Sequence, residues 1–203
     1  MTALSASAAS LAAHGVAYAL PIARAAERNR LDPTLLAAVA AQETGGPGAN
    51  AGRNILGDGG HGHGLFQIDD RYHAFARSPA AMDPGRNAEH AAEMLHGLLQ
   101  RYGGDERAAL SAYNAGSPTA RGTTTRWSDG STLGYADSVL RHQAQIEDAR
   151  AELPEAAARI GNYATPMGAP PGIPLAPPPA AQHGEQPWLD ELAAETNAST
   201  PTS

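Results

Sequence analysis

The spacing of apolar side chains predicts that the chain is mainly helical. A first helix has Asp32 as its N-cap and Pro33 as its first residue, and it ends near Gly45. Its buried face consists of Leu35, Leu36, Val39 and Ala40. A second helix is predicted after Asn87, because apolar residues recur there at the 3.6-residue helical period. They are Ala91, Met94, Leu95, Leu98 and Leu99.

Two further helices are predicted in the second half of the chain. Asp105 caps one of them, which runs to about Tyr113 and stops at the sequence Asn-Ala-Gly. The segment Leu133–Glu152 carries the other, with Tyr135, Val139 and Ile146 on its apolar face. Between the first and second helices, residues 49–64 form a glycine-rich loop, and residues 65–68 form a short strand or small β element at its exit.

Composition divides the chain into three parts. Alanine supplies much of the 42% hydrophobic content, and aromatic residues make up only 5%, which favours close-packed helices over a β-sandwich. Residues 164–187 are rich in proline and poor in large apolar side chains, which predicts a disordered Pro/Ala-rich tail. We therefore expect an N-terminal segment at 1–13, one catalytic domain at 14–160 and the tail at 161–203.

Charge and hydropathy exclude several classes of partner. The formal net charge of −7 provides no basic field for nucleic acid, and no run of about 20 apolar residues predicts membrane insertion. Residues 1–20 lack a Lys/Arg-rich start, and His14 and Gly15 interrupt their Ala/Ser run, so a standard secretory signal is not expected. The absence of cysteine excludes disulfides and thiol catalysis.

Glu43 is the first candidate for catalysis. It lies where an apolar helix meets Gly45-Gly46, so the negative end of the helix dipole and partial burial should both raise the pKa of its carboxyl group. A carboxyl that stays protonated near neutral pH can donate a proton to a departing sugar oxygen. The alternative is a solvated glutamate in a last helical turn.

A glycine-rich loop with a carboxylate at each end follows Glu43. Asp58 and Asp69 delimit a segment with glycines at 59, 60, 62 and 64, and Gly57 precedes it. Glycines permit positive φ and let the backbone approach a ligand closely, so this loop is suited to line a groove for a polymer.

Five short motifs together resemble the goose-type lysozymes and, more distantly, the soluble lytic transglycosylases. The resemblance covers roughly residues 20–150. The motifs are Gln42-Glu43, the Gly-Asp…Gly-Leu-Phe-Gln-Ile-Asp run at 57–69, Asp-Arg-Tyr-His at 70–73, Leu-Ser-Ala-Tyr-Asn-Ala-Gly at 110–116 and Gly-Tyr-Ala-Asp at 134–137.

The resemblance implies a lysozyme-like, goose-type fold and assigns roles to residues. Glu43 matches the catalytic acid, and Asp58 and Asp69 match two aspartates that position the attacking water; their separation of 11 residues agrees with the family pattern. The segment between Glu43 and Asp58 is slightly longer than in the family. Five further positions match residues that contact the sugar chain: Gln67, His73, Tyr113, Asn114 and Tyr135.

Four of these five have a structural alternative. Tyr113 and Tyr135 could serve as core residues, Asn114 as a helix cap and His73 as a surface histidine. Arg71 is expected to be structural.

His61 and His63 form a His-x-His pattern beside the aspartates. Because a third and fourth ligand at convincing spacing are missing, we expect no metal and no cofactor. In the tail, the segment Trp188–Leu192 could form a short helix that docks weakly on a partner, but disorder is the favoured interpretation.

The expected function is hydrolysis of the β-1,4 bond between N-acetylmuramic acid and N-acetylglucosamine in peptidoglycan glycan strands, with inversion. Two alternatives stay open: a lytic transglycosylase, which forms 1,6-anhydromuramic acid, and a non-catalytic glycan-binding or virion structural module. Delivery to the cell wall is expected through phage-type release as a bacteriolytic endolysin, carriage in a virion, or a non-standard secretion route.

Overall fold

A computed structural model describes residues 5–160, with side chains up to residue 148, and confirms a mainly helical protein. In this part of the chain the α-helices are α1 (Ala6–Ala13), α2 (Ala19–Asn29), α3 (Pro33–Ala40), α4 (Pro84–Arg101), α5 (Glu106–Ala115) and α6 (Tyr135–Ile160). Two 3₁₀ turns, Ala74–Arg77 and Pro79–Met82, lead into α4.

Aspartate side chains cap three of these helices. Asp32, Asp83 and Asp105 accept hydrogen bonds from backbone N–H groups two or three residues further on, which satisfies donors that the first turn leaves open. The predicted caps at Asp32 and Asp105 are therefore confirmed. Helix α4 begins at Pro84, earlier than the predicted start after Asn87, which is a fully buried helical residue.

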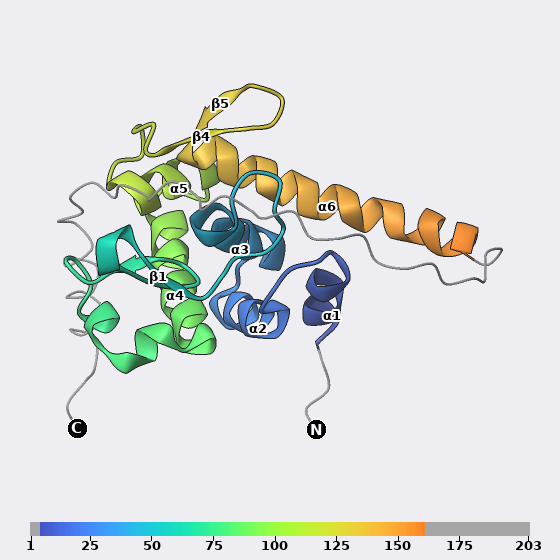
Figure 1. The fold of residues 1–203 in the computed structure, drawn as a ribbon. Coiled ribbons are helices and arrows are strands. Elements are labelled where there is room, and N and C mark those ends of the chain that lie inside the picture. Colours follow the sequence, from blue (N-terminus) through green and yellow to red (C-terminus); the bar gives the residue numbers. More distant parts are fainter. Residues whose placement is uncertain (1–4, 161–203) are drawn as a thin grey trace.

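Helix α3 forms the centre of the core. Every residue from Thr34 to Ala40 is buried, and the helix contacts α1, α2 and α6 (Figure 1). Such a helix is apolar all round because neighbours cover each of its faces. Its three alanines allow these neighbours to approach closely, so the core fixes the position of the residues that follow α3.

Helix α1 belongs to the same core. Ala8 and Leu11 are buried in it, and the helix contacts α2 and α3. Residues 6–13, which we had predicted to belong to a separate segment at 1–13, are therefore part of the domain. The pattern of that helix is weak because alanine and serine provide few large side chains to mark its buried face.

The glycine-rich segment folds into a small antiparallel sheet of order β1-β2-β3. Its strands are β1 (Ile55–Gly57), β2 (Gly62–Gly64) and β3 (Ile68–Asp69). We had predicted a loop over residues 49–64 and a strand over 65–68. The predicted positions of loop and strand were wrong: β1 and β2 lie within the predicted loop, and β3 begins only at Ile68. Gln67 has a positive φ of 49° and turns the chain just before β3.

The second half of the domain ends in a hairpin and a long helix. Strands β4 (Thr124–Arg126) and β5 (Thr132–Gly134) pair antiparallel, and α6 begins directly after β5 (Figure 1). The hairpin was not predicted. Among the described residues, no helix combines the length and apolar character that crossing a membrane requires. The predicted tail and its Trp188–Leu192 segment lie outside the described residues.

Candidate active site

Glu43 lies in a π-helical turn at the end of α3. The turn spans Ala41–Gly45, and the N–H of Gly46 donates to the carbonyl of Ala41 at 3.0 Å, which closes it. The predicted position of Glu43 at a helix end is thus confirmed. Single π turns are frequent at functional sites.

The turn is fastened to the segment that precedes β1. The buried Thr44 hydroxyl accepts from the N–H of Arg53 at 2.7 Å. A Cβ at Gly45 would lie 2.3 Å from the carbonyl oxygen of Ala51, so only glycine allows this close approach. The backbone on both sides of Glu43 is therefore held in place.

Tyr135 fixes the carboxyl group of Glu43. Its hydroxyl donates to Oε1 of Glu43 at 2.6 Å, across 92 residues of sequence. Tyr135 is 1% exposed, and burial together with the nearby Glu43 charge raises its pKa well above the ordinary value. The Tyr135 hydroxyl is therefore protonated at neutral pH and can donate this hydrogen bond.

Tyr113 stacks beside this pair. The Tyr113 and Tyr135 rings lie 6.3 Å apart between centroids with an interplanar angle of 17°. Burial and, to a lesser extent, the Glu43 charge raise the pKa of Tyr113 as well. Both tyrosines thus pack in the core and lie close to Glu43, so the two interpretations drawn from the sequence are compatible.

Arg71 joins the two predicted aspartates. Its Nη2 lies 2.5 Å from Oδ2 of Asp58 and 2.5 Å from Oδ2 of Asp69, and its Nε donates to Asp69 at 3.0 Å. The Asp69 side chain is 5% exposed and that of Asp58 is 18% exposed. These hydrogen bonds, chiefly the one to Asp69, raise the pKa of Arg71. The charged guanidinium therefore holds two carboxylates in one arrangement.

Gln67 holds the small sheet together. Its Nε2 donates to the carbonyl oxygens of Ile55 at 3.1 Å and Gly64 at 2.8 Å. A Cβ at Gly57 or Gly62 would approach Oε1 of Gln67 to 2.0 or 2.5 Å, so both glycines are needed to admit the amide. The side chain has a structural task, and its contact with sugar stays a prediction.

Four of the predicted site residues line one small pocket. Gln67, Asp69, His73 and Tyr113 surround it, together with Phe66, Ile68 and Met94. Its volume of about 20 Å³ has room for about one water molecule. Tyr113 connects this pocket to Glu43, because it also stacks on the tyrosine that binds the Glu43 carboxyl group.

His73 and Asn114 occupy different surroundings. His73 is half-buried, lines the pocket and meets the ring of His90 edge-on at 5.6 Å. Asn114 is buried, and its Oδ1 accepts from the N–H of Thr123 at 2.8 Å, which anchors the segment that leads to β4. Gly116, in the left-handed conformation, caps α5, so the structural alternative for Asn114, that it serves as a helix cap, does not hold. Its contact with sugar stays a prediction.

Two features of the site were not found from the sequence. The bridging role of Arg71 was missed, although an arginine two residues after an aspartate is within reach of its carboxylate. The hydrogen bond between Tyr135 and Glu43 joins distant segments, and no local pattern indicates it.

Comparison with protein families gives one match. The model described as the Transglycosylase SLT domain matches residues 21–130, a span that contains Glu43, Asp58, Asp69, Arg71 and Tyr113. Searches among curated proteins and among solved structures give no match.

Proposed function

The chain belongs to the Transglycosylase SLT family of lysozyme-like, peptidoglycan-cleaving enzymes, and from this premise we propose that it is a goose-type muramidase. The proposed reaction is hydrolysis of the β-1,4 bond between N-acetylmuramic acid and N-acetylglucosamine, with inversion at the anomeric carbon. The observation that carries the proposal is the pair of aspartates that Arg71 holds together, one of them at a water-sized pocket.

Glu43 acts as the general acid in this reaction. It donates its proton to the glycosidic oxygen, which leaves with the N-acetylglucosamine residue as the bond to C1 of N-acetylmuramic acid breaks. The carboxylate that forms accepts a hydrogen bond from Tyr135, and a hydrogen bond to a charged acceptor is stronger than one to a neutral acceptor. Tyr135 therefore favours the product of proton transfer.

Asp69 and Asp58 position the water that attacks C1 from the opposite face. Asp69 borders the pocket, and Arg71 keeps its carboxylate oriented through two nitrogens. As water attacks, its proton passes toward the aspartate pair, which completes the hydrolysis. In an inverting enzyme the acid and the water-activating carboxylate work on opposite faces of the sugar.

A lytic transglycosylase is the second candidate, and the description of the family favours it. In that reaction the muramyl 6-hydroxyl attacks C1 in place of water, so an acid/base glutamate suffices. The aspartate pair would then have no part in the chemistry. A non-catalytic glycan-binding or virion module would bind peptidoglycan without turnover.

The aspartates therefore supply the test. On purified cell walls, followed by loss of turbidity, Glu43→Gln should abolish cleavage, and Asp69→Asn should slow it by about 10²-fold or more. Asp58→Asn should slow cleavage less than Asp69→Asn does, because Asp69 still holds the water. Asp148→Asn, an exposed carboxylate on α6, is the matched control. Full activity in the Asp58→Asn, Asp69→Asn double variant would contradict the proposed hydrolysis.

We further propose that the enzyme reaches the cell wall by phage-type release, by carriage in a virion or by a non-standard secretion route. A neighbouring holin or tail gene would identify the route.

A further inference from the structure

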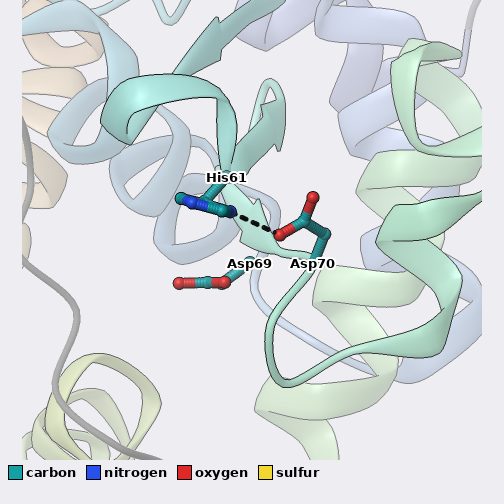
Figure 2. A group of neighbouring side chains, drawn as sticks. All are labelled: His61, Asp69 and Asp70. Atoms are coloured by element: carbon teal, nitrogen blue, oxygen red, sulfur yellow. Dashed lines mark hydrogen bonds and ion pairs between the residues drawn. The ribbon is translucent and has the colours of Figure 1, made fainter.

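Three potential metal ligands gather on the small sheet, beside the aspartate pair. Atoms of His61, Asp69 and Asp70 that can bind a metal all lie within 4.8 Å of one another. Figure 2 shows the imidazole of His61 directed at Asp70, with the carboxylate of Asp69 next to them. Nδ1 of His61 is 2.8 Å from Oδ1 of Asp70.

The strand register brings His61 and Asp70 together, and Asp69 is the chain neighbour of Asp70. In the β2–β3 pair, Gly62 lies opposite Asp69, and the N–H of Asp70 donates to the carbonyl of His61 at 3.0 Å. His61 and Asp70 are therefore cross-strand neighbours, whose side chains meet on one face. The backbone hydrogen bonds of the sheet hold the cluster in place, and the cluster does not need to form from a flexible loop.

Neighbouring side chains orient the two carboxylates. Nε2 of His63 lies 3.3 Å from Oδ2 of Asp70, while Arg71 binds Asp69. Metal-binding carboxylates are commonly hydrogen-bonded by a second layer of residues, which fixes their orientation. His63 and Arg71 occupy that position here.

The local charge favours a cation. Three carboxylates, those of Asp58, Asp69 and Asp70, lie around two guanidinium groups: Arg71 binds the first two, and Arg77 donates to the backbone carbonyl of Asp70 at 2.7 Å. With neutral histidines these groups carry a net charge of −1. His61 is 46% exposed at its side chain, so an ion has access from solvent.

The geometry points to a binding site for one divalent transition-metal ion, with zinc as the best fit, held by His61, Asp70 and Asp69. One imidazole nitrogen and carboxylate oxygens are ligands that zinc accepts, with water completing four-coordination. Tetrahedral ligands at about 2.0 Å from the ion are roughly 3.3 Å apart, so a small side-chain rotation closes the cluster. The inference replaces our expectation of no metal, because the register supplies Asp70, which the His-x-His spacing did not indicate.

Zinc binding to the untagged full-length protein tests this site without any substrate. After removal of metals with a chelator, isothermal titration calorimetry with ZnCl₂ at pH 7 should show one equivalent bound. Co²⁺, which occupies zinc sites, should give an absorption band in the visible region. The affinity for both ions should fall at least tenfold in His61→Ala and in Asp70→Asn.

His96→Ala is the matched control, since His96 lies on α4 and its imidazole bonds Gln100. This variant should bind zinc as the unmodified protein does. Circular dichroism establishes that each variant is folded. Because the His61 side chain is more exposed than that of Asp70, His61→Ala is the variant less expected to disturb folding. The inference would be overturned if the unmodified protein bound no zinc. It would also be overturned if His61→Ala and Asp70→Asn bound zinc as tightly as the unmodified protein.

Discussion

Replacing Tyr135 by phenylalanine isolates the hydrogen bond that holds Glu43. The change removes one hydroxyl at 2.6 Å from Oε1 and keeps the ring that stacks on Tyr113. A neutral hydrogen bond contributes about 0.5–1.5 kcal/mol and one to a charged group about 1.5–3 kcal/mol. Because the Glu43 carboxylate forms only as its proton leaves, the transition state loses about 1–1.5 kcal/mol more than the ground state. The turnover rate should therefore fall about tenfold.

The same variant has a signature in its pH profile. Tyr135 remains protonated because burial raises its pKa, so its hydroxyl stabilises the charged form of Glu43. Without that donor Glu43 should hold its proton more firmly. The alkaline limb of the rate profile, measured by turbidity loss on purified walls, should then move to higher pH.

A purely structural role predicts a different result. Tyr135→Phe would lower the free energy of unfolding, measured in urea, without moving the alkaline limb. A turnover rate within twofold of the unmodified protein, with the limb in place, would refute the role of Tyr135 in the reaction.

Three further predictions concern the rest of the chain. Arg71→Gln should slow wall cleavage at least tenfold and move the acid limb of the pH profile to higher pH, because Asp69 loses the cation that favours its charged form. Arg71→Lys should restore only part of the rate, and an unchanged acid limb would contradict this role. Burial lowers the pKa of His142 from 6.5 to about 4, so its contribution to stability is present above pH 6.5 and is lost as pH falls toward 4. The free energy of unfolding in urea should therefore decrease over this range by up to about 3 kcal/mol, a decrease that His142→Phe should lack. Equal pH dependence in the two proteins would contradict this prediction. Ending the chain after Asn162 should leave folding and turbidity loss on cell walls largely intact, because the removed residues are rich in proline and poor in large apolar side chains; loss of most activity would place the boundary elsewhere.

The sequence was sufficient for the helices whose signals are local. Asp32 and Asp105 mark the starts of helices, because their side chains accept hydrogen bonds from backbone N–H groups of the first turn. Gly116 ends α5 in a left-handed conformation. Helix α1 escaped detection because its alanines and serines form a buried face without large side chains. Strand β2 was missed because glycine-rich segments indicate loops, whereas here Gly62 makes space for Gln67.

The sequence identified the candidate catalytic residues but not the contacts between them. Glu43 at a helix end followed from periodicity and the Gly-Gly stop, and the two aspartates followed from a resemblance to a family. Their connections did not follow. The Tyr135 hydrogen bond spans 92 residues, and the contact between His61 and Asp70 depends on a register that no local rule gives.

The products released from peptidoglycan test the central claim most directly. Purified walls are digested with the unmodified protein, and the muropeptides are analysed by mass spectrometry, with Glu43→Gln as the inactive control. Hydrolysis with Asp69 and Asp58 positioning water predicts free reducing N-acetylmuramic acid ends, initially in the α configuration. A predominance of 1,6-anhydro ends, lighter by one water, would contradict the account and make the chain a lytic transglycosylase.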